Sequence, residues 1–125
     1  MNDMSSRMRR MFELAKRLSH KSNSCHKLGC VIANRNRVVS VGFNNMNKTH
    51  PKASAPWKTL HAEIDALIGV GFNDVEGCSA YVYRELKSGK PALSKPCSAC
   101  ELALRKAGIV IVHYTTDGGW TSMAL

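Results

Sequence analysis

The chain has 125 residues, of which 44% are hydrophobic and 22% are charged. This size and composition predict a single globular domain over residues 1–125 and exclude a disordered chain. No stretch approaches the roughly 18 consecutive apolar residues of a membrane span, and the N-terminus has no apolar run of signal-peptide length, so we expect a cytoplasmic protein without a membrane partner. Five cysteines, an odd number, argue for reduced thiols and against a disulfide framework.

The chain is strongly basic, with a net charge of +9 from 18 Lys and Arg against 9 Asp and Glu. The excess is concentrated near the N-terminus, at Arg7, Arg9, Arg10, Lys16, Arg17 and Lys21. Such a cluster predicts a phosphate-bearing partner, although charge runs also form ordinary solvated helix faces. Charge alone does not separate a nucleotide from a nucleic acid.

The first half of the chain predicts a helix, a hairpin and a loop. Ser5 or Ser6 can cap a helix whose apolar residues recur at three- and four-residue spacing as far as Leu18. The runs LGCVIA and VVSVGFN flank NRNR, which predicts an antiparallel hairpin with its turn at residues 34–37. Residues 44–58 are polar and contain two prolines, so we expect a loop there.

The middle of the chain predicts a second helix and a third strand. TLHAEIDALIG, residues 59–69, has the composition of an apolar helix that ends at its last glycine. SAYVYR, residues 79–84, predicts a strand. Residues 85–95 contain lysine and glycine and predict a long loop.

The last third predicts a helix and a buried strand. Ser94 and Pro96 are start signals for a helix that Gly108 would end. IVIVHYTT, residues 109–116, is a buried-type strand, and residues 117–125 form either a short edge strand or a tail. The order α, β, β, α, β, α, β implies an α/β fold, with a mixed sheet and helices on its faces.

Two short motifs begin the second and third predicted helices. HAE contains His61 and Glu63, and PCSAC contains Cys97 and Cys100. Zinc is bound by imidazole nitrogen and thiolate sulfur, and a catalytic zinc site has three protein ligands and one open position. A three-residue spacing puts both cysteines on one helix face, where the helix N-terminus lowers the thiol pKa. A C-x-x-C pair alone would equally fit two small core residues, so the pairing with HAE gives the pattern its specificity.

H-x-E followed by P-C-x-x-C, each at a helix start and separated by a strand, is the signature of zinc nucleobase deaminases. From about Lys27 to Thr116 the chain resembles the zinc-dependent cytidine and deoxycytidylate deaminase superfamily. KTHP, residues 48–51, is similar to a loop of small phage-type members. The resemblance implies a three-layer α/β/α fold with a mixed central sheet of about five strands, a Zn²⁺ cofactor, and subunits that associate into a homo-oligomer.

In this family resemblance Glu63 is the proton shuttle, and His61, Cys97 and Cys100 are the zinc ligands. Helix periodicity alone would instead pair His61 with Asp65, because residues four apart share a helix face. If Thr59 is near the helix cap, His61 and Glu63 fall in the first turn and can converge beyond its end. Asp65 would then make a salt bridge, support the metal ligands or be exposed.

Weaker predictions concern substrate contacts and the remaining cysteines. The predicted substrate-binding residues are Asn44, Ala62, Tyr83, Arg84, Lys48 and His50. The asparagine occupies the family's G-x-N position but is also a common turn residue. Lys48 and His50 are about equally well explained as solvated loop charges. Tyr83 is about equally well explained as a core residue. Cys25, Cys30 and Cys78 are expected to pack in the interior.

Three functions fit these observations. The first is deamination of a free cytosine nucleotide, deoxycytidylate-like, with the basic residues binding the 5′-phosphate. The second is deamination of cytosine or adenine in single-stranded DNA, RNA or tRNA, which would favour a basic groove with stacking aromatics; the 6% aromatic content tilts against it. The third is a non-catalytic, zinc-stabilised binding module, which predicts a fourth protein ligand and no need for Glu63.

Overall fold

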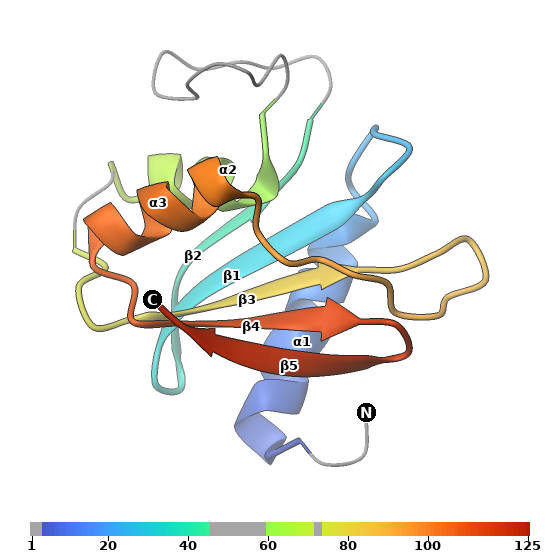
Figure 1. Cartoon of the computed structure of the whole chain (residues 1–125), viewed down its shortest axis with the longest axis horizontal. Helices are drawn as coiled ribbons and strands as arrows, with labels where there is room; N and C mark the ends of the chain where they lie inside the picture. The colour runs from blue at the N-terminus through green and yellow to red at the C-terminus, as the bar shows by residue number, and fades with distance from the viewer. Residues whose placement is uncertain (1–3, 46–59, 72–73) are drawn as a thin grey trace.

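The computed structural model describes residues 4–45, 60–71 and 74–125, which form a five-stranded mixed sheet with helices on both faces (Figure 1). The strand order is β2-β1-β3-β4-β5. The elements are α1 (Ser6–Ser19), β1 (Leu28–Asn34), β2 (Arg37–Phe43), α2 (Ala62–Gly69), β3 (Ser79–Arg84), α3 (Ser98–Ala107), β4 (Ile111–Thr116) and β5 (Gly119–Ala124). The predicted α/β class and the predicted number of strands are therefore confirmed. In the described parts of the chain, no helix has the length and apolar character needed to cross a membrane.

The first helix covers one face of the sheet. Its N-cap is Ser5, whose hydroxyl accepts a hydrogen bond from the Met8 amide at 3.2 Å, as the capping pattern predicts. The buried side of α1 packs against β1 and β3 and includes Phe12 and Ala15 (Figure 1). Gly29 permits this close approach, because a Cβ there would lie 2.0 Å from the Ala15 carbonyl oxygen.

The hairpin forms where it was predicted, and its first strand becomes an interior strand of the sheet. β1 pairs antiparallel with β2 on one side and with β3 on the other, which explains its nearly continuous burial. β3 and β4 form a parallel pair, and α3 lies between them in the chain. β5 pairs antiparallel with β4, so the C-terminal segment is an edge strand, one of the two predicted alternatives.

The second and third helices lie on the opposite face of the sheet from α1 (Figure 1). α2 lies very close to β2, because Gly42 has no side chain. A Cβ on Gly42 would lie 2.5 Å from both the Ala62 carbonyl oxygen and the Ala66 amide nitrogen. Ser40 adds a second tie, since its hydroxyl donates to the Ala66 carbonyl at 2.7 Å. This contact sets the position of the N-terminus of α2.

Gly42→Ala is expected to lower the free energy of unfolding by about 1–3 kcal/mol, because the new methyl group must displace helix backbone rather than a flexible side chain. Urea denaturation measures the change. The matched control is Gly119→Ala, where the nearest atom, Thr116 Oγ1, would lie 3.4 Å from the Cβ. The control should change stability by less than about 0.5 kcal/mol. Equal losses of unfolding free energy in the two variants would show that the contact with α2 is not what requires glycine at position 42.

The helix α3 begins within PCSAC, as the motif predicts, but not at Ser94, the first of the two start signals. The N-cap is Cys97 rather than Ser94, although the helix ends as predicted at Gly108, which has a φ of 99°. Ser94 is 2% exposed, and its hydroxyl donates to the Val82 carbonyl at 2.8 Å and accepts from the Thr115 amide at 2.8 Å. A serine that resembles a helix start in the sequence therefore fastens the loop to the sheet, and the helix N-cap lies three residues later.

Candidate metal centre and active-site cavity

The N-termini of α2 and α3 meet at the predicted metal ligands. His61 is the N-cap of α2 and Cys97 the N-cap of α3, and neither side chain makes a capping hydrogen bond. Cys100 follows in the first turn of α3, with its Sγ 3.4 Å from His61 Nδ1. One nitrogen or sulfur atom from each of the three residues lies within 4.8 Å of the others. The structure thus brings together the three ligands that the motifs predict.

The donor set fits zinc. Burial lowers the pKa of His61, which favours the neutral imidazole that coordinates metal. Cys100 is fully buried, and this burial, followed by the charges of Glu63 and Cys97, raises the pKa of its thiol. A divalent cation would reverse this effect by stabilising the thiolate. The two helix N-termini each contribute a partial positive charge of about +0.5, which also favours the thiolates.

Glu63 is a buried carboxylate on the wall of the same cavity. Its side chain is 3% exposed and lies in the first turn of α2. Burial raises its pKa to about 6, although hydrogen bonds from its own backbone and from the Cys100 thiol act in the opposite direction. The N-cap is His61 itself, two residues beyond the assumed Thr59, which lies outside the described residues. The first-turn position predicted for Glu63 is nevertheless correct.

Asp65 has a different position. Its Oδ2 accepts a hydrogen bond from the Phe43 amide at 3.1 Å. This bond ties α2 to the end of β2, immediately before Asn44. Asp65 does not line the metal cavity, whereas Glu63 does. The acid that helix periodicity would pair with His61 therefore supports the adjacent strand.

The cavity has a volume of about 300 Å³. His61, Ala62, Glu63 and Cys97 form its metal side, and Asn44 also lines it. The Asn44 side chain also holds the backbone, because its Oδ1 accepts from the Leu28 amide at 2.9 Å and its Nδ2 donates to the His26 carbonyl at 2.5 Å. Asn44 thus lines the cavity, and its side chain bonds to the segment before β1 rather than within a local turn; its substrate contact stays a prediction.

Arg84 lies in a neighbouring cavity of about 490 Å³ that shares Ser24 and His26 with the metal cavity. Its guanidinium donates to the Leu93 carbonyl at 3.2 Å and lies 2.8 Å from His26 Nδ1. Lys27 and Lys87 also line this second space. The metal cavity therefore has a neighbour whose wall carries these cations together with the Glu85 carboxylate.

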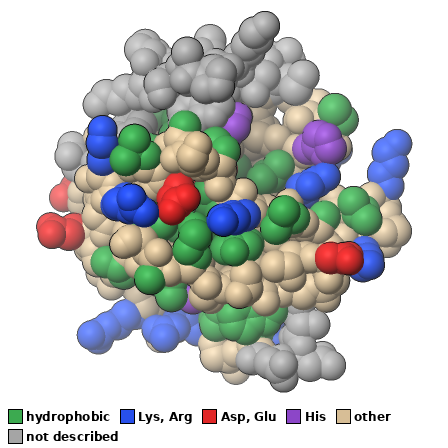
Figure 2. Space-filling model, viewed as in Figure 1, with side chains coloured by type: hydrophobic (Ala, Val, Ile, Leu, Met, Phe, Trp, Pro, Cys, Tyr) green, Lys and Arg blue, Asp and Glu red, His purple; other side chains and the backbone are tan. Residues whose placement is uncertain are grey.

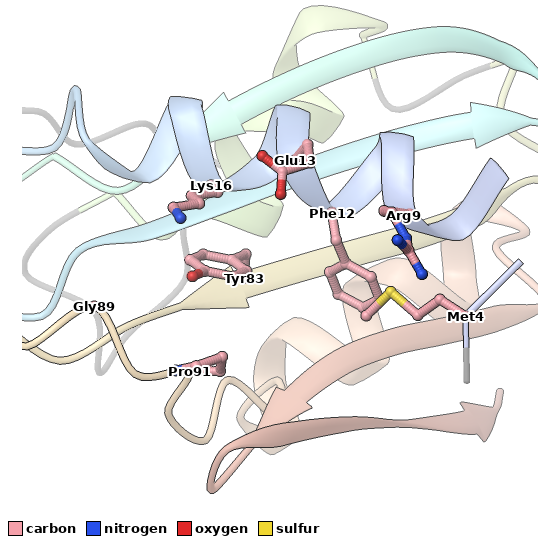
Figure 3. Close-up of a pocket in the computed structure, with 8 residues that line it drawn as sticks. All are labelled: Met4, Arg9, Phe12, Glu13, Lys16, Tyr83, Gly89 and Pro91. Atoms are coloured by element: carbon pink, nitrogen blue, oxygen red, sulfur yellow. The ribbon is translucent and has the colours of Figure 1, made fainter. Parts of the chain in front are cut away.

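Tyr83 does not reach either cavity. Its side chain is 4% exposed on the α1 face of the sheet, and its hydroxyl donates to Glu85 Oε2 at 2.6 Å. It lines a separate cavity of about 320 Å³. Figure 3 shows it beside α1, together with Phe12 and Lys16. The predicted substrate contact of Tyr83 therefore has no support in this fold, and its core alternative holds. Lys48 and His50 lie outside the described residues.

The structure adds Ser24, His26 and Lys95 to the cavity wall. The hairpin register is the signal that points to the first two, because it pairs Gly29 with Phe43 and so places the residues before β1 beside those after β2. The buried cysteines Cys30 and Cys78 pack in the interior as predicted, but Cys25 is exposed, and that prediction is wrong. Its place in the polar segment before β1 explains the exposure.

Residues 1–116 match the family model described as the cytidine and deoxycytidylate deaminase zinc-binding region. The chain belongs to this family. Human deoxycytidylate deaminase is 29% identical over 101 residues, which cover 70% of this chain and 51% of that protein. An uncharacterized deaminase of Aliivibrio fischeri is 30% identical over 113 residues, which cover 84% of this chain and 69% of that protein. The chain therefore spans about half the length of the deoxycytidylate deaminases that it matches.

Solved structures of deaminases share the fold. The dCMP deaminase of cyanophage S-TIM5 in its apo form aligns with a TM-score of 0.68 at 21% identity, covering 89% of this chain and 84% of that one. The cytidine deaminase of Burkholderia pseudomallei gives a TM-score of 0.67 at 20% identity, covering 97% and 93%. These similarities confirm the expected deaminase-like α/β/α fold. The family's zinc-binding description and the grouped His61, Cys97 and Cys100 together identify zinc as the cofactor.

Proposed function

We propose that this protein catalyses the hydrolytic deamination of a cytosine nucleotide, deoxycytidylate-like, converting cytosine to uracil with release of ammonia. The observation that carries the proposal is the buried Glu63 carboxylate on the same cavity wall as His61 and Cys97. A purely structural zinc module needs four protein ligands and has no use for a buried carboxylate beside them. Among the described residues, the metal group has three ligands.

The chemistry divides between the cofactor and Glu63. Bound zinc would supply the Lewis acidity that makes water nucleophilic near neutral pH. Glu63 would take a proton from the attacking water and return protons to the ring nitrogen and the departing amine. A carboxyl pKa raised by burial to about 6 suits a group that must both accept and donate a proton near pH 7. Ala62, a small buried residue between His61 and Glu63 in the chain, lines the space where the base would lie.

A nucleotide is favoured because the metal cavity lies next to the cavity around Arg84. His26 lines both cavities, and Lys27 and Lys87 add positive charge to the second. These groups suit a 5′-phosphate, with Asn44 close to the sugar. The cyanophage S-TIM5 dCMP deaminase has been crystallised with dCMP and dUMP, at a TM-score of 0.64 and 19% identity to this chain.

A polynucleotide substrate is less well supported. Binding a single strand without sequence preference uses a continuous basic groove with stacking aromatics. On the face drawn in Figure 2, most Lys and Arg side chains of the described residues are separated by hydrophobic and polar groups, and a few lie together only at the lower left edge. Aromatic residues make up only 6% of the chain.

Ammonia release by the zinc-loaded protein tests the proposal. The substrates to compare are dCMP, CMP, deoxycytidine, adenosine and a single-stranded oligonucleotide containing cytosine. We expect the highest kcat/KM for a cytosine monophosphate. Turnover of the oligonucleotide with inert dCMP and CMP would replace the proposal with the polynucleotide function, and no turnover of any cytosine compound would refute it.

A further inference from the structure

A cavity of about 410 Å³ lies at the opposite end of the sheet from the metal ligands. Its wall includes Asn34 and Ser79, at the end of β1 and the start of β3, whereas the metal cavity adjoins Leu28 at the start of β1. Arg7, near the start of α1, also lines it. None of the residues that line it lines the metal cavity. It is therefore a separate site.

The Tyr81 hydroxyl faces this cavity without a partner. Tyr81 is 4% exposed, and in the described parts of the chain its hydroxyl makes no hydrogen bond. No polar side-chain atom sealed in the described interior lacks a partner, so this hydroxyl must reach the cavity space. Its ring is held edge-on by Phe12 at 5.6 Å and stacked on His113 at 4.6 Å. Burial raises the Tyr81 pKa, although Arg7 acts to lower it, so the hydroxyl stays a donor at neutral pH.

Two arginines line the same cavity as that hydroxyl. Arg7, in the first turn of α1, and Arg35, in the β1–β2 turn, both line the cavity. The 14-residue helix α1 has no acidic side chain in its first turn, so its positive N-terminal end lacks a counter-charge there. Burial, and then the charge of Arg7, lower the pKa of His113, which favours its neutral form. Glu76 is the one carboxylate in the wall.

We propose that this cavity binds the phosphate group, or an oxyanion of similar size, of a small phosphorylated molecule. The Arg7 and Arg35 guanidinium groups supply charge and fork-shaped donors, and the Tyr81 hydroxyl completes the coordination from the floor. Charged donors at a helix N-terminus form a common phosphate site. The Glu76 carboxylate would repel an extended polyanion, so the geometry favours a single anionic group over a nucleic acid strand.

The test is a titration of the zinc-loaded protein with inorganic phosphate at pH 7.5 and constant ionic strength, followed by amide chemical shifts. We expect saturable shifts centred on Arg7, Arg35 and Tyr81. Tyr81→Phe keeps the packed ring and removes only the hydroxyl, and it should weaken binding at least about tenfold, as should Arg35→Gln. Arg17→Gln removes one exposed arginine at the other end of α1 and should change the affinity less than about twofold.

The proposal is overturned if the shifts do not saturate, if they are confined to the metal cavity, or if Tyr81→Phe binds phosphate as tightly as the unmodified protein. Equal weakening by Arg17→Gln would also overturn it, because the binding would then follow net charge rather than this cavity. The measurement requires no turnover, so its result is independent of the proposed deaminase activity.

Discussion

Glu63→Gln is expected to reduce kcat for dCMP by a factor of about 10²–10⁴ while leaving zinc content and the unfolding temperature nearly unchanged. The amide fills the same buried space, so packing is preserved, but it can neither accept a proton from water nor return one to the leaving amine. Steady-state ammonia release, with zinc measured on the same samples, checks the result. An amide variant with substantial turnover would refute the assignment of Glu63 as proton carrier.

Asp65→Asn is the matched control, because it makes the same chemical change two residues along α2. The asparagine oxygen can still accept the hydrogen bond that the Phe43 amide gives to Asp65 Oδ2. We therefore expect kcat to fall less than tenfold. If Asp65→Asn were the inactive variant and Glu63→Gln the active one, the pairing of His61 with Asp65 by helix periodicity would be correct.

Cys97→Ala is expected to abolish stable zinc binding and, with it, deamination. Only His61 and Cys100 remain as ligands. Removing a residue that only hydrogen-bonds to a ligand typically weakens metal binding by about 10- to 100-fold, and the loss of zinc affinity here should be larger. Cys97 is exposed, so the metal-free fold should lose little packing. Zinc per chain, measured after dialysis against a weak chelator, should fall from about one to near zero.

Cys25→Ala is the control for this measurement. Cys25 is also an exposed cysteine, but it does not belong to the metal group. The zinc content of the Cys25→Ala variant should match that of the unmodified protein. Loss of zinc in both variants would mean that the metal is held by surface thiols in general, and retention in both would remove Cys97 from the ligand set.

Local patterns predicted most of the fold because each element carries its own signals. Ser5 caps α1, SAYVYR is β3 from its first residue to its last, and Gly108 ends α3. Ser94 does not start α3, because its hydroxyl bonds to Val82 and Thr115. Such a tertiary hydrogen bond leaves no periodic trace in the sequence.

The metal ligands were predictable from motif spacing, but the substrate side of the cavity was only partly so. Tyr83 and Arg84 are adjacent in β3 and so point to opposite faces of the sheet. The sequence does not show which face α1 covers, and Tyr83 proved to be on that face. His26 lies in a segment without regular structure before β1, and only the hairpin register places it beside Asn44.

The most direct test of the proposed function is the rate of dUMP formation from dCMP by the zinc-loaded protein and by Glu63→Gln at equal zinc content. The arrangement of Glu63 beside His61 and Cys97 predicts steady formation of dUMP with one ammonia per product in the unmodified protein and almost none in the variant. Absence of dUMP in the unmodified protein, or equal rates in the two, would contradict it.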